Sequence, residues 1–221
     1  AKTLPSATAI AAARARSNWS QITLHTDGAQ KSAATARVDL GGIAKGFAID
    51  RALSAMKARG AKGGLVDIGG DMRVFGDPPS GKHWTIHVRS PFKRGQTIAT
   101  LALKKGAVCT SGNYARYVEI GGKRFSHILD PKSGRPVDRV PSVTVIADDA
   151  MTADGWATAL SVLGKGGLKR LPAGIDAMLI DGQTKRATAT AGFVAKLTIK
   201  PKLPISIMGN KTLDHGARSK P

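Results

Sequence analysis

The segment "ADGWAT" carries two oxygen-bearing side chains that could bind a metal ion. Asp154 and Thr158 are four residues apart, so they share one face if the segment is helical. A carboxylate and a hydroxyl are hard oxygen ligands suited to Mg²⁺, which keeps several waters and also takes phosphate oxygens. A solvated polar stripe would show the same spacing, so the pair by itself leaves both interpretations open.

A second segment, "VDLGGIAKGFAID" (residues 38–50), combines features that bind phosphate. We place Asp39 at the end of a strand, Gly41 and Gly42 in a turn, and Lys45 in the first turn of a helix. Glycine backbone N–H groups and the positive end of a helix attract phosphate oxygens, and Lys45 adds a charge. The order of residues is neither a P-loop nor a dinucleotide fingerprint. A glycine turn followed by a solvated lysine also fits.

Two further segments could contact the same ligand. In "TSGNY", Thr110, Ser111 and the backbone of Gly112 can donate hydrogen bonds to an anion, and Tyr114 is available for stacking. His127 lies where a strand runs into the turn "DPKSGRP", a combination that a site for an ionised ligand could use. A simple turn and a structural histidine are the alternatives.

Hydrophobic periodicity predicts the elements that hold these residues. Apolar positions recur at three- and four-residue steps from Ile43 to the glycine stop at Gly60, which predicts a helix. A second helix follows in "AMTADGWATALSVLG", capped by Asp148 or Asp149. Alternating or apolar runs predict strands in residues 21–28, 36–40, 63–76, 83–91, 97–112, 116–129, 142–150, 175–181 and 187–199. Within 116–129 we expect a hairpin closed by Gly121 and Gly122.

Two main helices among many strands indicate an α+β domain with mixed or antiparallel sheets. We assign this domain to residues 17–199. Residues 1–16 are rich in small side chains, so we expect a linker, a frayed helix or the remnant of a longer portion. Residues 200–221 form a basic tail with proline and glycine, which we expect to be disordered.

Composition restricts the class of protein. The 221 residues contain one cysteine, so an intrachain disulfide is excluded, and we interpret Cys109 as a small buried apolar residue. No apolar run is long enough for a transmembrane helix, and no signal peptide is visible. The net charge of +19 favours an anionic ligand or polyanionic partner. A nucleic-acid-binding domain is the less favoured alternative, because the few aromatic residues do not cluster with basic ones.

Six segments, in this order along the chain, resemble the FAD:protein FMN transferases, the ApbE-type flavin transferases. They are "VDLGGIAKGFAID", "LVDIGGDMRVFG", "VCTSGNYARY", "SHILDPKSGRPV", "VTVIADDAMTADGWATALSVLG" and "AMLID". The resemblance extends from about Ser17 to about Asp181. It implies the flavin-transferase (ApbE-like) fold and Mg²⁺-dependent transfer of FMN from FAD to a Thr or Ser hydroxyl of a target flavoprotein, with release of AMP. A protein that only binds FAD, or hydrolyses it to FMN and AMP, is the alternative within the same fold.

The resemblance also implies roles for individual residues. By motif, Asp154, Thr158 and the backbone carbonyl of Gly42 resemble the metal ligands. Lys45 and His127 resemble catalytic residues, with His127 beside the pyrophosphate. The segments around FAD would be formed by Asp39, Gly42, Lys45, Gly69, Gly70, Asp71, Thr110, Ser111, Gly112, Tyr114, His127 and Ile128.

Partners and location follow from the resemblance alone. Besides FAD, Mg²⁺ and an acceptor flavoprotein, we expect a separate N-terminal segment or a second copy to complete the site. The reason is that an N-terminal portion closes over the flavin in the family, and nothing before about Ser17 matches it. The family further implies a periplasmic or exported protein associated with a membrane.

Overall fold

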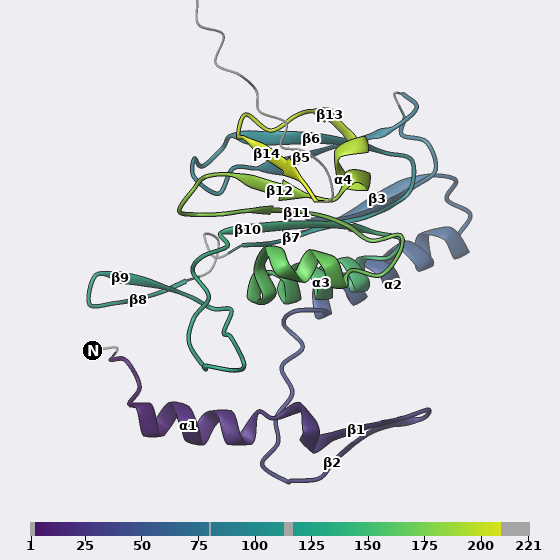
Figure 1. Cartoon of the computed structure of the whole chain (residues 1–221). Helices are drawn as coiled ribbons and strands as arrows, with labels where there is room; N and C mark the ends of the chain where they lie inside the picture. Colours follow the sequence, from purple (N-terminus) through teal and green to yellow (C-terminus); the bar gives the residue numbers. More distant parts are fainter. Residues whose placement is uncertain (1–2, 80, 113–116, 209–221) are drawn as a thin grey trace, which may run out of the picture.

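The computed structural model describes residues 3–79, 81–112 and 117–208. Its centre is a seven-stranded sheet with the strand order β14-β12-β11-β10-β7-β4-β3. Helices α2 and α3 cover one face, and a smaller sheet with the order β13-β6-β5 covers the other (Figure 1). The large sheet comprises β3 (Gly64–Ile68), β4 (Asp71–Phe75), β7 (Gly106–Gly112), β10 (Ser142–Ala147), β11 (Asp176–Ile180), β12 (Ala187–Ala189) and β14 (Ile205–Ile207), and the small one β5 (Trp84–Arg89), β6 (Thr97–Leu103) and β13 (Leu197–Ile199).

The central strand β10 explains why the sheet is covered on both faces. All six of its residues are buried, as expected for an apolar run with layers on either side. Val143 and Val145 pack in the core on the side of α3, whereas Ile146 packs in the core that contains the small sheet. Neighbouring strands pair antiparallel except β12 and β14, which are parallel. The α+β class predicted from the sequence is therefore confirmed.

The two main helices form where the periodicity predicts them. Helix α2 spans Ala44–Ala58, and α3 spans Ala150–Leu163. Of the two candidate caps, Asp149 is the N-cap of α3, because its side chain accepts a hydrogen bond from the backbone N–H of Thr152. Gly164 ends α3 with a φ of 63°, a conformation that glycine adopts at little cost.

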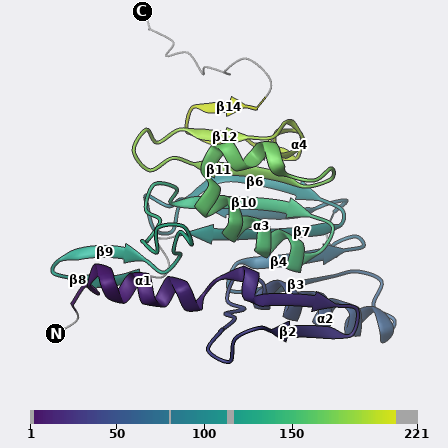
Figure 2. The same cartoon turned by 60° about the horizontal axis from the view of Figure 1, so that its bottom comes forward.

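The N-terminal arm, residues 3–32, lies outside these layers (Figures 1 and 2). It consists of helix α1 (Ala7–Arg16), a 3₁₀ turn (Trp19–Gln21) and the hairpin of β1 (Ile22–His25) with β2 (Gly28–Lys31). No residue of the arm is buried. Its contact with the rest of the chain includes a hydrogen bond from Arg14 Nε to the carbonyl oxygen of Pro131. In the part of the chain described, no helix combines the length and apolar character needed to cross a membrane.

Three predictions of secondary structure are wrong. Residues 36–40 form no strand, because the partner of β1 is residues 28–31 and the side chains of Val38 and Leu40 stay exposed. The predicted closing strand at 187–199 contains the short helix α4 (Ala191–Ala195), capped by Thr190. The tail is ordered as far as residue 208, because β14 pairs with β12 and buries Ile205. Residues 209–221 lie outside the described part.

Candidate functional site

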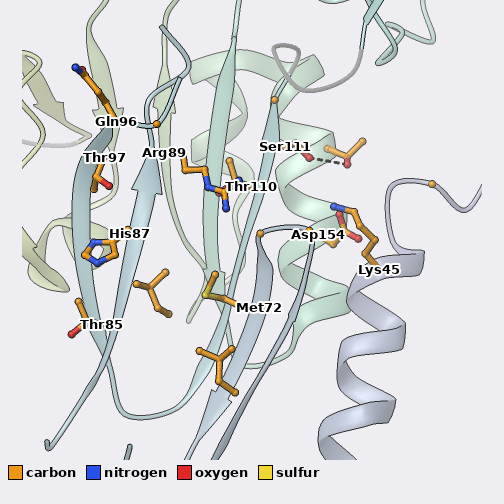
Figure 3. Close-up of a pocket in the computed structure, with 18 of the residues that line it drawn as sticks. Lys45, Met72, Thr85, His87, Arg89, Gln96, Thr97, Thr110, Ser111 and Asp154 are labelled. Carbon is orange, nitrogen blue, oxygen red and sulfur yellow. Dashed lines mark hydrogen bonds between the residues drawn. The ribbon is translucent and has the colours of Figure 1, made fainter. Parts of the chain in front are cut away.

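A cavity of about 560 Å³ opens beside the N-terminal ends of the two main helices, and its volume is in the range of small-molecule sites. Its wall comes from α2, the β3–β4 hairpin, β5, the start of β6, β7, α3 and the residue after β9 (Figure 3). It is lined by Gly41, Lys45, Leu65, Gly69, Gly70, Met72, Thr85, Ile86, His87, Arg89, Gly95, Gln96, Thr97, Thr110, Ser111, Gly112, His127, Asp154 and Thr158.

Lys45 and Asp71 form an ion pair at one side of the cavity. Asp71 is only 1% exposed, and a carboxylate that far from water requires charged or hydrogen-bonding partners. Lys45 supplies the charge, and the backbone N–H of Thr110 donates to Asp71 Oδ1 at 2.7 Å. The pair therefore joins α2, β4 and β7 and holds the Lys45 ammonium at the cavity wall.

The turn between β3 and β4 consists of Gly69 and Gly70, both of which line the cavity. Their φ angles are 67° and 96°, which two-residue hairpin turns require and which side chains disfavour. The N–H of Gly70 donates to Asp67 Oδ1 at 2.7 Å. The turn leaves the cavity open at this edge, since neither residue has a side chain.

Asp154 lies on α3, faces the cavity and is 2% exposed. Its Oδ2 accepts a hydrogen bond of 3.1 Å from the N–H of Gly46. Burial raises the pKa of this carboxyl, and the charge of Asp71 adds to the effect, while the Gly46 N–H and Lys45 oppose it. Two buried carboxylates therefore face one ammonium group, an imbalance that a further cation would relieve.

Thr158 lines the cavity one turn after Asp154, so the two share a face as their spacing predicts. The Thr158 hydroxyl is 3.2 Å from the Ser111 hydroxyl. Gly42 adjoins it, because a Cβ on Gly42 would lie 3.2 Å from Thr158 Oγ1. A carboxylate and a hydroxyl beside a glycine backbone fit a hard divalent cation such as Mg²⁺. Among the residues described, no three His, Cys, Asp or Glu side chains form a metal cluster.

His127 reaches the cavity wall from the end of a hairpin. That hairpin pairs β8 (Tyr117–Ile120) with β9 (Lys123–Ser126) around Gly121 and Gly122, as predicted. Ile128, the next residue, is buried and does not line the cavity; its N–H donates to the Ser126 hydroxyl at 3.1 Å. The histidine is thus held between a hairpin and a buried neighbour.

The structure brings most of the predicted site residues together. Those that line the cavity are Lys45, Gly69, Gly70, Thr110, Ser111, Gly112, His127, Asp154 and Thr158. Gly42 and Asp71 do not line the cavity themselves; Gly42 lies beside Thr158, and Asp71 pairs with Lys45. Asp39 does not lie at a strand end as predicted, since no strand forms there, and its exposed carboxylate accepts a hydrogen bond from the Gly41 N–H at 2.7 Å. Tyr114 lies outside the described residues.

The cavity wall formed by β5 and β6 was missed by the sequence prediction. Thr85, His87 and Arg89 of β5 line it, together with Gln96 and Thr97. His87 Nδ1 is 3.2 Å from the Thr100 hydroxyl. Alternation in "HWTIHVRSP" carried a signal, because the exposed polar residues are every second one while Ile86 and Val88 are buried. It shows an exposed face, but not that the face borders a cavity.

Cys109 lies in β7 beneath the site and is fully buried. Its Sγ is 3.5 Å from the carbonyl oxygen of Ala150, the first residue of α3. Burial, with the nearby charges of Asp71 and Asp154, raises the pKa of the thiol far above its usual value. The thiol therefore packs as a small apolar group between sheet and helix.

Comparison with known proteins places this architecture. Residues 1–179 match the ApbE family. The FAD:protein FMN transferase of Rhodobacter capsulatus is 41% identical over 146 residues, which are 65% of this chain and 28% of that protein. The Klebsiella pneumoniae (strain 342) protein of the same name is 37% identical over 168 residues, which are 73% and 48% of the two. The chain thus spans less than half of these curated relatives.

Solved structures agree with the sequence comparison. The ApbE protein of Thermotoga maritima superposes with a TM-score of 0.79 at 34% identity, covering 88% of this chain and 64% of the other. The flavin transferase ApbE of Vibrio cholerae gives a TM-score of 0.78 at 30% identity and covers 89% and 64%. The predicted flavin-transferase fold is therefore confirmed, and the chain belongs to the ApbE family.

Proposed function

We propose that this chain carries the FAD site of a flavin transferase, which moves the FMN part of FAD onto a Thr or Ser hydroxyl of an acceptor flavoprotein and releases AMP. The observation that carries the proposal is the convergence of Lys45, His127, Asp154 and Thr158 on one cavity. These residues come from three motifs separated along the sequence. The names of the relatives support flavin transfer in general.

The reaction requires positioning and charge neutralisation more than covalent chemistry from the protein. The acceptor oxygen bonds to the FMN phosphorus, the bond from that phosphorus to the bridging oxygen breaks, and AMP leaves with the bridging oxygen. Lys45 and the donors Thr110 and Ser111 face the cavity where the diphosphate oxygens would bind. His127 is one of several titratable groups that line the cavity, and we assign to it the removal of the acceptor hydroxyl proton.

Asp154 and Thr158 would hold Mg²⁺, with the Gly42 backbone beside them. When bound, Mg²⁺ supplies positive charge to the diphosphate and to the leaving AMP. The support for this assignment is the donor set itself and the two buried carboxylates that share a single ammonium group.

Calorimetric titration of FAD with and without Mg²⁺, beside a titration of AMP, tests the site. We expect binding that requires the intact dinucleotide and strengthens with Mg²⁺. Asp154→Ala should abolish the effect of Mg²⁺ on FAD affinity. The loss of Mg²⁺ affinity should exceed the roughly 10–100-fold that loss of an outer-shell partner costs a metal site. Asp148→Ala is the matched control, because this exposed aspartate precedes the same helix. Equal Mg²⁺ effects in both variants would contradict the metal assignment.

Transfer and hydrolysis are separated by the acceptor. A hydroxyl-bearing acceptor protein incubated with FAD, Mg²⁺ and this chain should gain the mass of FMN less one water, while AMP appears in equal amount. AMP release that is as fast without acceptor, with no labelled protein, would favour the alternative, an FAD-hydrolysing protein. Binding without AMP release in either mixture would leave FAD binding as the function.

A partner segment and an export route complete the proposal. The N-terminal arm, of which no residue is buried, offers a surface for a separate N-terminal segment or a second copy at the site. Its addition should raise FAD affinity in the same titration, and an unchanged affinity would contradict it.

The periplasmic or exported, membrane-associated location rests on family resemblance alone. Cell fractionation against periplasmic and cytoplasmic markers tests it, and recovery with the cytoplasmic marker would overturn it.

A further inference from the structure

Asp50 lies on α2 but acts at the beginning of α3. Its Oδ1 accepts a hydrogen bond of 2.9 Å from the N–H of Ala150, and its Oδ2 accepts one of 2.9 Å from the N–H of Met151. These are the first two residues of α3, whose N–H groups have no partner within their own helix. The helix already has its ordinary cap in Asp149, which accepts from Thr152. Asp50 is therefore a second cap, supplied by another element.

The contact between α2 and α3 is held in both directions. Asp154, one turn into α3, accepts a hydrogen bond from the N–H of Gly46, which lies one turn before Asp50 in α2. Gly46 allows the two backbones to touch, because a Cβ there would overlap the carbonyl oxygen of Ala150. One carboxylate thus points from α2 to α3, and the other points from α3 to α2.

Arg73 extends this arrangement to the sheet. Its guanidinium donates to Asp50 Oδ1 at 2.7 Å, and both side chains are mostly buried, at 22% and 19% exposure. Arg73 lies on β4 two residues after Asp71, the partner of Lys45. Side chains two apart on a strand lie on the same face. Asp50 and Lys45 therefore connect α2 to one face of β4 at two neighbouring points.

We propose that Asp50 is a positioning residue for the candidate metal site. By holding the first turn of α3 against α2 and β4, it sets where the carboxylate of Asp154 and the hydroxyl of Thr158 meet the cavity. The effect on Mg²⁺ and FAD rests on the proposed function. The effect on the hydrogen bond between Asp154 and the Gly46 N–H is a property of the folded chain without ligand, so it does not depend on the proposed function.

The test compares Asp50→Ala and Asp50→Asn with Asp149→Ala. All three alter the capping of α3, but only Asp50 also connects α3 to α2, on which it lies, and to β4 through Arg73. Two readouts are used: hydrogen exchange at the Gly46 amide without ligand, and the factor by which Mg²⁺ strengthens FAD binding. We expect Asp50→Ala to reduce the Mg²⁺ factor by about 10-fold, the scale for loss of an outer-shell partner. It should also speed Gly46 exchange by about 10-fold, the scale for loss of a hydrogen bond to a charged group. After correction of the exchange rate for the change in global stability, Asp149→Ala should change either readout by less than about twofold.

Asp50→Asn keeps one oxygen acceptor and so guards against a variant that does not fold; we expect a change between those of the other two variants. Equal changes in the Asp50 and Asp149 variants would reduce Asp50 to a second helix cap and overturn the proposal, as would unchanged Gly46 exchange in both Asp50 variants. Absence of FAD binding by the unaltered chain would defeat the proposed function instead. In that case Gly46 exchange still decides whether Asp50 positions Asp154.

Discussion

The N-terminal arm and the junction of α2, α3 and β4 are built in opposite ways. The arm has a capped helix and a four-pair hairpin ladder, yet none of its residues is buried. In the junction, Ile49 and Leu160 are fully buried and carboxylates cross between the helices. Local hydrogen bonds are sufficient to form a helix or a hairpin. Holding one side chain at a fixed distance from another requires contacts between helices and strands. The candidate catalytic groups lie in the second kind of region.

Glycine substitution should separate the two regions most strongly. Gly46→Ala places a methyl group onto the backbone of Ala150, so we expect the free energy of unfolding to fall by more than about 3 kcal/mol, beyond the usual range for overpacking. Gly28→Ala in the arm meets nothing within 4 Å and should leave it unchanged. Urea denaturation followed by circular dichroism measures both. Similar losses would mean that the arm is as tightly packed as the junction.

Removing large apolar side chains should give the next largest difference. Leu160 is 0% exposed and Leu24 is 65% exposed. We expect Leu160→Ala to cost about 3 kcal/mol in unfolding free energy and Leu24→Ala less than about 0.5 kcal/mol. The same denaturation experiment applies. A loss at Leu24 close to that at Leu160 would show that the arm buries its apolar residues in solution.

Asp154 should make the junction sensitive to pH. Because burial raises its pKa in the folded chain above the ordinary 3.8, the folded state binds more protons than the unfolded state between the two values. Stability then falls as pH rises through that window. Without divalent cations, Asp154→Asn should therefore raise the melting temperature at pH 7 and not below pH 3.8. Asp27→Asn in the arm should change it by less than about 1 °C at either pH. A melting temperature lowered by Asp154→Asn at pH 7 would refute this.

Helix caps should give the smallest difference. Asp149→Ala removes the hydrogen bond to the Thr152 N–H and should cost about 1 kcal/mol. Ser6→Ala removes the equivalent bond to the Ala9 N–H in α1 but should leave cooperative unfolding unchanged, because α1 buries nothing. Its effect should appear as faster hydrogen exchange within α1. A loss of global stability with Ser6→Ala would show that the arm unfolds cooperatively with the rest of the domain.

Sequence patterns predicted the elements that have a clear period and a clear stop. Helix α2 was predicted because its apolar spacing ends at a glycine, and the β8–β9 hairpin because its turn is Gly121–Gly122. The strand predicted at 36–40 failed, because alternation of Val38 and Leu40 gives an exposed segment unless a partner strand is present. Helix α4 is only five residues long and depends on contacts of Thr190 with Asp176, which no local period reveals.

The candidate site was predicted on one side only. Lys45, Asp154 and Thr158 belong to segments whose residues and order resemble those of a known family, so they could be assigned to one site and were found together. Thr85, His87 and Arg89 are ordinary polar residues on the exposed face of a strand, and they border the cavity only because of where the small sheet lies on the large one. That relation depends on how two sheets pack, and a single sequence does not contain it.

The burial of Cys109 has a consequence for chemical labelling. The thiolate is the form that reacts with maleimides and iodoacetamide, and a raised pKa together with 0% exposure keeps this thiol un-ionised and out of reach. Since the chain has no other cysteine, a cysteine introduced on its surface would react alone. One dye in the N-terminal arm and another in a partner would then report their association by energy transfer, without removal of any native residue.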